Sequence, residues 1–561
     1  MYRAFSCGFC LAMVACGSSD QTGNDEGDAA SGGASSSGGA SGAGTSSGGS
    51  ATTGGASNSG GVANTGGAAN TGGAANTGGT SGTLDTSASV LERNKHANRD
   101  GVFVQPTLTA AEAAKMAKDT GFAATFTGNV WASPLYLEKG PGGKGVFIAV
   151  TTGNDVLALD ETTGATVWKK NIGSSPTANG VSCGSIHPLG IISTPVIDAA
   201  AGTLYVAGAI GTTSIARHEI HALSVMDGSE RAGFPVTVAG KSGSTTFTSP
   251  PENQRSALSL VNGILYVAYG GHVGDCGPYH GWVFGLDTKD PTKLGGWATL
   301  GQGEGIWAAG GMASDGDGVF AITGNSTVGA SDHMQSDSEQ VVRITGLGVF
   351  DRSNKNLYFP SSWRDMDSKD ADFGASNPVY VSVPGSTPAN VVAAISKDGH
   401  LYLLDPANLG GMGGHLVDFS IASGSMSIHT VPATYTTSKG VHVALSTDGG
   451  GMCPSGGASG HVVMSVLLAP GSPPKPQVEW CAAQGGPVTA PITTTTDGTS
   501  ETVVWYMNNG KLNGVDGDTG KVVFGGGTDT CSGVREWTSP IAVKGRLVAG
   551  GDGHFCSWSA H

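Results

Sequence analysis

Positively charged residues are scarce in this 561-residue chain, because 29 Lys and Arg stand against 44 Asp and Glu and leave a formal net charge of −15. Without a basic surface the chain has little to attract a phosphate backbone, so we expect no nucleic-acid partner. Long stretches of helix-forming residues are also rare, whereas glycine is abundant at 94 residues. This composition favours a large all-β domain with many turns.

Several common catalytic motifs are missing as well. After residue 85 the chain has no G-x-S-x-G elbow, no Walker phosphate loop and no H-E-x-x-H. The sequence therefore gives no signature of a serine hydrolase, a P-loop enzyme or a zinc protease.

The N-terminus has the pattern of an export signal. Residues 1–15 carry one early Arg and a short apolar run, which is too short to span a bilayer. The junction Met13-Val14-Ala15-Cys16 resembles the bacterial lipobox, with Met in place of the usual Leu. We predict a signal peptide over residues 1–15 and a lipid on Cys16, which anchors the protein at the outer membrane or cell surface. Cleavage nearby without lipidation is the alternative, and it gives a secreted or periplasmic protein.

Residues 16–84 consist mostly of Gly, Ser, Ala, Thr and Asn, with a repeated ANTGGA hexad near residues 63–79. So little apolar bulk cannot offset the entropy of ordering the chain. We predict a flexible tether that leads to a folded domain over residues 85–561.

The folded part repeats a unit of four strands. Residues 145–168 show its pattern most clearly: an apolar strand, a turn, a second strand that ends in Asp, a Thr-Gly turn and a third strand that ends in Trp168. Eight such units follow one another at roughly 50 to 65 residues each, and four strands at that period indicate a β-propeller blade. We predict an all-β, eight-bladed β-propeller with four-stranded antiparallel blades; seven blades are the alternative.

The last unit lacks its outer strand. We predict that residues 100–105, DGVFVQ, supply this strand and close the ring, which removes an exposed sheet edge. One short N-terminal helix is expected between Thr109, which stands at capping-box spacing from Glu112, and a stop at Gly121.

The phrase ALD-x-x-TG-x-x-x-W at residues 158–168 resembles the repeat of pyrroloquinoline quinone (PQQ) propellers, the quinoprotein alcohol dehydrogenase-like superfamily. The resemblance covers nearly all of residues 95–561. It implies the propeller architecture more specifically than it implies an activity, because non-catalytic assembly lipoproteins share the motif.

Strand order sorts the loops onto two faces. The strands of a blade run a, b, c, d from axis to rim, so b–c and d–a connections share one face. All six cysteines of the folded domain fall on this b–c/d–a face. Since exported proteins meet oxidising conditions, we predict three disulfides. Fifteen connectivities are possible; nearness suggests Cys183 with Cys276, Cys453 with Cys481, and Cys531 with Cys556. A zinc site is the alternative, although no pair has C-x-x-C spacing.

Long loops gather on the same face, which makes it the predicted binding face. The resemblance implies a quinone site there. Asn325, in the phrase TGN, would ligate calcium and contact the quinone. Asp372, or with less support Asp370, would be the catalytic carboxylate that removes the alcohol proton. Lys397 would contact the quinone oxygens.

Two further side chains could serve a cofactor or ligand near the axis. Trp307 could form the floor under a flat cofactor, with blade packing as its alternative role. Arg255 could bind a carboxylate or bridge blades. Simple turn capping remains the alternative for Asn325 and Asp372, and a solvated turn for Lys397.

The sequence also departs from the quinone-site pattern. It has neither the adjacent Cys-Cys pair of these alcohol dehydrogenases nor a C-x-x-C-H haem site. The blade-two loop has no Glu at the place of the calcium ligand, where Thr213 stands instead and Glu219 follows several residues later.

Three more residues are candidates for the ligand face: Glu304 beside Trp307, and Tyr279 and His280 in the loop GDCGPYHGW. We expect that loop to be first a brace held by Cys276, with His280 as a structural hydrogen bonder or a ligand contact.

Two functions follow from these observations. The first is a monomeric, exported, lipid-anchored ligand-binding or scaffold module that takes a small molecule, a carbohydrate or a protein. The alternative is a PQQ- and calcium-dependent dehydrogenase that oxidises an alcohol or a sugar. The missing Cys-Cys pair and Glu favour the first function, and Asn325, Asp372 and Lys397 favour the second.

Overall fold

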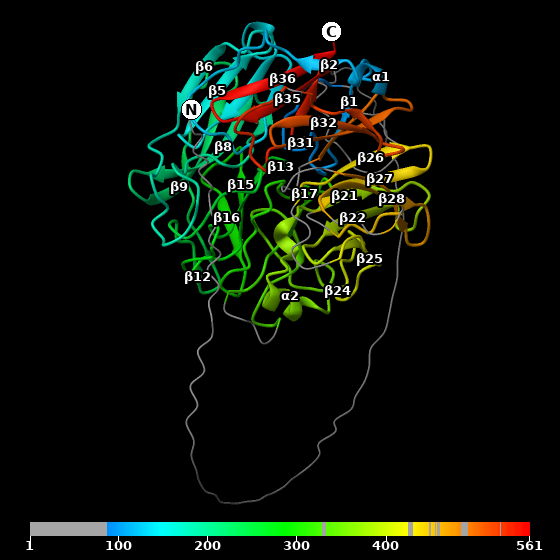
Figure 1. Ribbon diagram of the computed structural model, residues 1–561. Helices are drawn as coiled ribbons and strands as arrows, with labels where there is room; N and C mark the ends of the chain where they lie inside the picture. Colours follow the sequence, from blue (N-terminus) through cyan, green and yellow to red (C-terminus); the bar gives the residue numbers. More distant parts are fainter. Residues whose placement is uncertain are drawn as a thin grey trace, which may run out of the picture. The chain divides into compact units, whose positions relative to one another are not determined.

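The computed structural model describes residues 87–327, 333–423, 430–447, 450–454, 456, 460–483, 492–527 and 529–560. The predicted signal peptide, Cys16 and the predicted tether lie outside the described residues. Eight sheets of strands follow one another around a common axis, coloured from cyan to red in Figure 1. The predicted eight-bladed propeller is confirmed.

The first four blades occur in chain order, and each forms one antiparallel sheet. The strands of blades one and two are β3 (Leu135–Leu137), β4 (Val146–Val150), β5 (Asp155–Asp160), β6 (Thr166–Asn171), β7 (Val196–Asp198), β8 (Thr203–Gly211), β9 (Ile215–Ser224) and β10 (Val236–Thr237). A small hairpin, β11 (Lys241–Ser242) with β12 (Thr245–Thr246), precedes blade three. The strands of blades three and four are β13 (Ser259–Val261), β14 (Ile264–Tyr269), β15 (Trp282–Asp287), β16 (Leu294–Ala298), β17 (Ala313–Ser314), β18 (Val319–Ile322), β19 (Val341–Ile344) and β20 (Leu357–Phe359).

The next three blades repeat the pattern. The strands of blades five and six are β21 (Val379–Ser382), β22 (Asn390–Ile395), β23 (His400–Leu404), β25 (Val417–Ser420), β26 (Ala433–Thr437), β27 (Gly440–Thr447), β28 (Val462–Ala469) and β29 (Lys475–Ala483). A short strand, β24 (Gly411–Met412), pairs with the outer strand of blade four. The strands of blade seven are β30 (Ile492–Thr496), β31 (Thr502–Asn508), β32 (Lys511–Asp516) and β33 (Val522–Phe524).

The eighth blade closes the ring differently from the prediction. Its inner three strands are β34 (Ile541–Val543), β35 (Arg546–Gly551) and β36 (His554–Ala560). The outer strand is β2 (Met116–Lys118), which pairs antiparallel with β36. The predicted closing segment instead contains β1 (Val102–Val104), which pairs parallel with β30, the inner strand of blade seven. Closure by joining the two ends of the chain is therefore right, but the strand assigned to it is wrong (Figure 1).

The expected N-terminal helix is shorter than predicted. Helix α1 (Ala110–Ala113) is capped by Thr109, whose hydroxyl accepts the backbone N–H of Glu112. It ends early because Met116–Lys118 are needed as the closing strand, and pairing with β36 outweighs their helix propensity. The structure adds α2 (Trp363–Lys369) and two 3₁₀ turns, η1 (Pro141–Gly143) and η2 (Phe373–Ala375). None of the helices in the described part of the chain is long and apolar enough to cross a membrane.

The Asp and Thr-Gly residues of the repeat build the turn between the c and d strands. In blade one, Asp160 Oδ1 accepts the backbone N–H groups of Thr162 and Thr163. These hydrogen bonds, above all those from Thr163, lower the pKa of Asp160. Gly164 follows with a φ of +76°, a conformation that costs a glycine little. The motif therefore marks a rigid turn.

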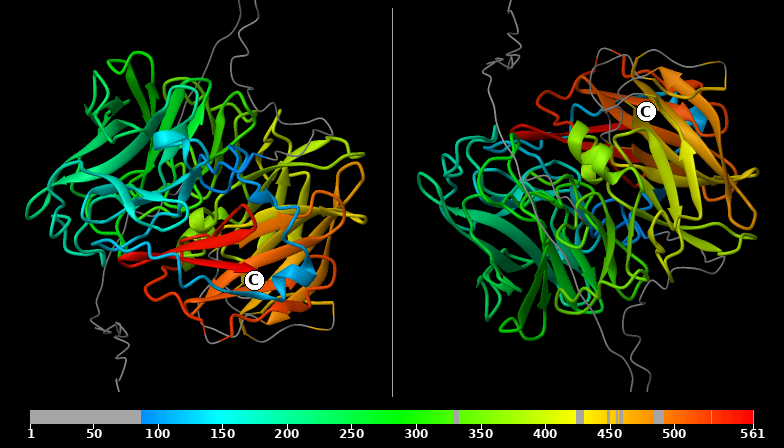
Figure 2. Two further views of the ribbon diagram at one scale, coloured as in Figure 1. Left: turned by 90° about the horizontal axis from the view of Figure 1, so that it is seen from above. Right: turned by 90° about the horizontal axis from the view of Figure 1, so that it is seen from below.

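A segment of the N-terminal part lies at the axis, against the inner strands of the blades. Its backbone bonds to blades two, four, five, six and seven through Leu91, Ala97, Asn98, Asp100 and Gly101. We call residues 90–101 the axial segment; it is drawn in blue between the blades in Figure 2. This arrangement was not predicted from the sequence.

Two fully buried arginines fix the axial segment. Arg93 donates to the carbonyl of Trp537 at 2.6 Å and to Ser539 in blade eight. Arg99 donates to the carbonyls of Met312 and Leu258, at 2.9 and 2.8 Å. Burial, and then repulsion from Arg99, lower the pKa of Arg93 to about 9. These bonds link blades that are far apart in the sequence.

All three predicted disulfides are confirmed: Cys183–Cys276, Cys453–Cys481 and Cys531–Cys556, with Cα–Cα distances of 5.8 to 5.9 Å. The pairing favours the disulfides over the zinc alternative, although the ligand atoms of Cys531, His554 and Cys556 lie within 4.8 Å of one another. One detail differs, because Cys481 lies within β29 and not in the connection after it. Cys183–Cys276 joins the connection before blade two to the b–c loop of blade three.

Candidate functional site

Three connections on the b–c/d–a face bring the predicted quinone-site residues together. Asn325 follows β18 in the b–c loop of blade four, and Lys397 follows β22 in the b–c turn of blade five. Asp372 lies between them in the chain, in the connection that contains α2. In both views of Figure 2, α2 lies between the green blades and the yellow and orange blades. Helix α2 ends at Asp370, whose φ of 55° turns the chain toward Asp372.

The centre of the site is a buried ion pair. Lys397 Nζ lies 2.9 Å from Asp372 Oδ2 and 3.3 Å from Asp370 Oδ2. The Lys397 and Asp372 side chains are only 4% and 6% exposed, whereas Asp370 is 55% exposed. Asp372 Oδ1 accepts the backbone N–H of Asn325 at 2.9 Å. The three predicted positions therefore converge, with Asp372 at the centre and Asp370 as a second partner of Lys397.

The charges in this pair depend on each other. Burial disfavours the ammonium of Lys397, but the carboxylates of Asp372 and Asp370 outweigh this effect and raise its pKa. Burial, and then the neighbouring Asp372 charge, raise the pKa of Asp370. Lys397 is therefore a permanent cation at neutral pH.

A second group of side chains lies nearer the axis. The guanidinium carbon of Arg255 lies 4.7 Å from the ring centroid of Trp537 and 5.3 Å from that of Trp307. The two indole rings meet edge to face, with centroids 6.2 Å apart. These residues come from the connections that precede blades three, four and eight. We call them the Arg255 clamp.

Among the described residues, the Arg255 guanidinium interacts with these two rings and with the charge of Glu536. It forms no hydrogen bond or ion pair with any residue that the structure describes, and its Nε is buried without a partner. Burial lowers the pKa of Arg255 to about 10, and the charge of Glu536 opposes this effect. At neutral pH Arg255 is therefore a cation that still needs acceptors.

Gly324 joins the two groups into one site. A Cβ built on Gly324 would lie 2.9 Å from Asp372 Oδ1 and 3.1 Å from Trp307 Nε1. Only a glycine allows the carboxylate and the indole to approach the backbone so closely. The Arg255 clamp and the Asp372–Lys397 pair are thus contiguous.

Glu304 lies behind this surface and not on it. It is fully buried, and its carboxylate accepts the Ser336 hydroxyl at 2.5 Å and the backbone N–H groups of Gly301 and Asp337. Burial raises the pKa of Glu304 to about 7, although these hydrogen bonds oppose the shift. The geometry gives Glu304 the role of a loop brace.

Tyr279 and His280 are also engaged with the protein. Tyr279 is buried and its hydroxyl donates to Asp275 at 2.6 Å. Burial, and then the Asp275 charge, raise the pKa of Tyr279. His280 Nδ1 lies 3.2 Å from the carbonyl of Thr299, and burial lowers its pKa. Both contacts agree with the expectation that this loop is first a brace.

Sequence reasoning missed several buried acids around the site. Glu339 is fully buried, and one of its oxygens accepts the backbone N–H of Phe373, next to Asp372. Glu252 is 1% exposed and accepts the backbone N–H of His280. Burial raises the pKa of both well above the ordinary value. Asp367 of α2 accepts the Ser326 N–H, and burial raises its pKa to about 6.

Trp537 was also missed, although a signal was present. The phrases W-A-S-P at residues 131–134 and W-T-S-P at residues 537–540 place a Trp two residues before the Ser-Pro that opens a blade. Trp131 makes a similar cation–π contact, because the guanidinium carbon of Arg535 lies 5.1 Å from the centroid of the Trp131 ring. Reading this phrase as a repeat would have indicated a ring of tryptophans near the axis.

Comparisons with known proteins bear on the fold. No protein-family model matches the chain, and no curated protein matches it either. Among solved structures, it is similar to quinohemoprotein alcohol dehydrogenases from Pseudomonas putida HK5, at 13% identity and a TM-score of 0.58, and from Comamonas testosteroni, at 14% and 0.56. These matches cover 84% and 85% of this chain, and 80% and 81% of the other chains.

A europium-containing methanol dehydrogenase is similar at 12% identity and a TM-score of 0.52, over 82% of this chain and 89% of that one. This chain has the fold of the quinoprotein dehydrogenases. At such low identity the structural similarity establishes the eight-bladed architecture alone. Any activity has to be argued from the residues of the site.

The donor set does not fit a calcium ion. Calcium takes six to eight oxygen ligands, but both oxygens of Asp372 already have partners in Asn325 N–H and Lys397 Nζ. The Asn325 side-chain amide makes no hydrogen bond to any described residue, so it is one available donor. Glu219 lies in β9 of blade two and pairs with Arg217 at 2.7 Å. The Lys397 ammonium thus supplies the positive charge beside Asp372.

The face of the Trp307 ring is also occupied, so it cannot support a flat cofactor as predicted. The Arg255 guanidinium lies over its face, where a flat quinone would have to stack. The residues present therefore do not fit PQQ with calcium in this arrangement.

Proposed function

We propose that the chain is an exported, lipid-anchored propeller that binds a small carboxylate-bearing ligand on its b–c/d–a face. The observation that carries the proposal is the Arg255 guanidinium, which is held between Trp307 and Trp537 with no hydrogen-bond acceptor among the described residues. A guanidinium presents paired N–H donors whose spacing matches a carboxylate.

The surroundings of Arg255 suggest the rest of the ligand. Two indole rings offer flat apolar surface to a ring or to the C–H face of a sugar. The Asn325 amide and the Asp372–Lys397 pair, which adjoin the clamp at Gly324, offer donors and acceptors to hydroxyl groups. A sugar acid combines these features. Export is supported by the lipobox-like junction at Cys16 and by the three disulfides.

Calorimetric titration of the full chain with D-galacturonate and with D-galactose tests the proposal. We expect the acid to bind more tightly than the neutral sugar. Arg255→Gln should weaken binding of the acid by roughly tenfold or more, because a hydrogen bond to a charged group contributes about 1.5–3 kcal/mol. Arg231→Gln, an exposed arginine in blade two, is the control. Equal binding of the acid and the neutral sugar, or no effect of Arg255→Gln, contradicts the proposal.

A quinone-dependent dehydrogenase is the second candidate, because Asn325, Asp372 and Lys397 converge even though the Arg255 guanidinium covers the face of Trp307. Incubating the full chain with PQQ and calcium, followed by gel filtration, separates the two. We expect no quinone absorbance to remain with the protein and no dye reduction with alcohols or sugars. Retained quinone with dye reduction would replace the first function by the second.

A further inference from the structure

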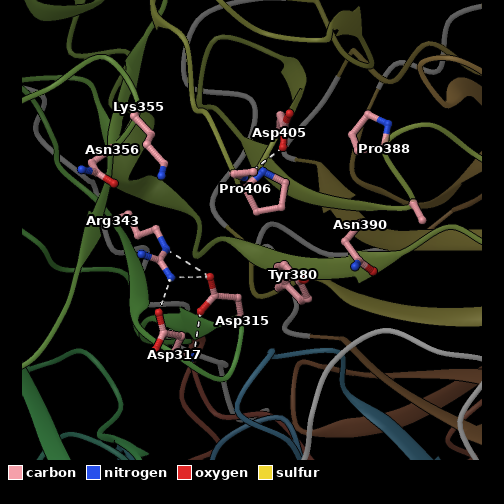
Figure 3. A pocket seen from close by; sticks show the side chains of 12 residues that line it. Asp315, Asp317, Arg343, Lys355, Asn356, Tyr380, Pro388, Asn390, Asp405 and Pro406 are labelled. Atoms are coloured by element: carbon pink, nitrogen blue, oxygen red, sulfur yellow. Dashed lines mark hydrogen bonds and ion pairs between the residues drawn. The ribbon is translucent and has the colours of Figure 1, made fainter. Parts of the chain in front are cut away.

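A pocket lies on the opposite face of the propeller, between blades four and five, and has a volume of about 510 Å³. Pockets of roughly 300–1,000 Å³ are the size that holds small molecules. The lining comes from a–b and c–d turns and from the strands β19, β21 and β22: Asp315, Asp317, Arg343, Lys355, Asn356, Tyr380, Pro388, Ala389, Asn390, Asp405, Pro406 and Ala407 (Figure 3). None of these residues belongs to the site around Arg255.

One wall of this blade 4–5 pocket is a fixed network of charges. Arg343 donates from Nε and Nη2 to Asp315 Oδ2, at 3.0 and 2.8 Å, and lies 3.2 Å from Asp317 Oδ2. Figure 3 shows the three side chains together at one side of the pocket. Because these groups neutralise one another in part, this wall is pre-organised and does not call for a charged ligand.

Two other polar side chains lie along the lining. Asn390 Oδ1 is buried and accepts no hydrogen bond within the described part of the protein. The Lys355 ammonium forms no hydrogen bond or ion pair with any described residue, and Figure 3 shows it directed toward the pocket. The Nδ2 of Asn390 is not among the buried atoms and donates to no described residue, so Asn390 and Lys355 both favour a ligand that accepts. The carboxylates of the lining favour one that also donates.

The net charge of the lining excludes most ions. Three carboxylates against two cations leave the pocket slightly negative, which disfavours phosphate and carboxylate ligands. A divalent cation is disfavoured too, since Asp315 and Asp317 already hold Arg343, and Asp405 Oδ1 accepts the backbone N–H of Ala407.

The remaining lining is flat and partly apolar. Pro388 and Pro406 offer surfaces against which C–H groups can pack, whereas the Tyr380 ring is buried and stacked on Phe320. A neutral ligand that both donates and accepts from neighbouring atoms, and that has apolar faces, fits all these features. We propose that the blade 4–5 pocket binds a neutral polyhydroxylated ligand, a saccharide, as a second site that is independent of the Arg255 clamp.

Calorimetry and saturation-transfer NMR of the full chain with cellobiose, maltose and lactose test this inference. We expect at least one of these neutral disaccharides to bind. Asn390→Ala and Lys355→Met should each weaken that binding by roughly threefold to tenfold, the loss expected for one hydrogen bond. Lys475→Met, an exposed lysine of blade six, is the matched control and should have no effect.

The variant pattern separates this pocket from the site around Arg255. Arg255→Gln should leave disaccharide binding unchanged, whereas it should weaken binding of galacturonate. If none of the three disaccharides binds, or if Asn390→Ala and Lys355→Met both leave the affinity unchanged, the inference is wrong. Binding that responds only to Arg255→Gln would place the sugar in the first site and would equally overturn it.

Discussion

At the scale of single residues, the site depends on charges that are buried together. Lys397 and Asp372 are almost fully covered, so each makes the burial of the other tolerable. Lys369 and Asp365 on α2 form a comparable pair at 2.7 Å, but their side chains are 58% and 63% exposed. Only the buried pair should matter to stability, because solvent screens the exposed one.

Lys397→Met should therefore destabilise the protein by about 3 kcal/mol, since it leaves the buried Asp372 carboxylate without its partner. Lys369→Met should change stability by less than about 0.5 kcal/mol. Urea unfolding of the two variants measures the difference. Adding Asp372→Asn to Lys397→Met should restore part of the loss. Equal stabilities of Lys397→Met and Lys369→Met would show that the pair is not buried as described.

Glu304 should make stability depend on pH. Its folded pKa is about 7 against an ordinary value of 4.5, so between these values the folded state binds more protons than the unfolded state. The contribution of Glu304 to the free energy of unfolding is fully present below pH 4.5 and is lost as the pH rises through 7. The loss amounts to about 3 kcal/mol at most, at about 1.4 kcal/mol per pKa unit.

Urea unfolding at pH 4.5 and pH 7 checks this expectation. Glu304→Gln should flatten the fall in unfolding free energy between the two values, because the amide does not titrate. Glu112→Gln on α1, where the side chain is exposed, should leave the fall unchanged. Parallel curves for the parent chain and Glu304→Gln would contradict the buried, proton-binding role of Glu304.

At the scale of elements, the axial segment explains how blades far apart in sequence are held together. Arg99→Met should destabilise the protein by about 3–5 kcal/mol, because it leaves the Glu92 carboxylate without its ion-pair partner and the carbonyl of Leu258 without a donor. Arg231→Met, which removes an exposed bond to Gly202, is the control and should have little effect. Thermal unfolding compares them. A Tm for Arg99→Met equal to that of the control would mean that the axial segment does not brace the ring.

Much of the architecture could be predicted at this scale because the blade repeat is local. The Asp and Thr-Gly turn recurs within a few residues, as at Asp160 and again at Asp516, where the hydroxyl of Thr519 donates to the carboxylate. Strand parity placed the cysteines on one face, and nearness in the chain then suggested the pairs that the structure contains. Closure could not be read correctly, since Val102–Val104 look more strand-like than Met116–Lys118, and only the path of the axial segment decides which of them reaches blade eight.

The candidate site was predicted in part. Asn325, Asp372 and Lys397 were found through their resemblance to quinone-site positions, and they converge. The Arg255 clamp was not foreseen as a unit, because its members come from connections before three different blades. Helix α2 was missed although Trp363 and Met366, both buried, stand three residues apart, and Asp365 and Lys369 stand four apart.

At the scale of the whole molecule, export and anchoring rest on the sequence around Cys16. Metabolic labelling with palmitate should label the parent chain and not Cys16→Ser, because the lipid is attached to that cysteine. Cys10→Ser is the matched control. Cys10 lies within the predicted signal peptide, so this variant still has Cys16 and should keep the label. Label that persists in Cys16→Ser would contradict the lipid anchor.

The two faces of the propeller also differ in the ligand chemistry that they offer. The b–c/d–a face presents Arg255 between two indole rings, and the opposite face presents the mixed polar lining of the blade 4–5 pocket.

The most direct test of the central claim is a crystal structure of the full chain soaked with D-galacturonate. The account predicts density for the carboxylate within hydrogen-bond distance of the Arg255 guanidinium, with the sugar ring against Trp307 or Trp537. A sugar acid seen only elsewhere, with Arg255 in contact with protein groups alone, would contradict it.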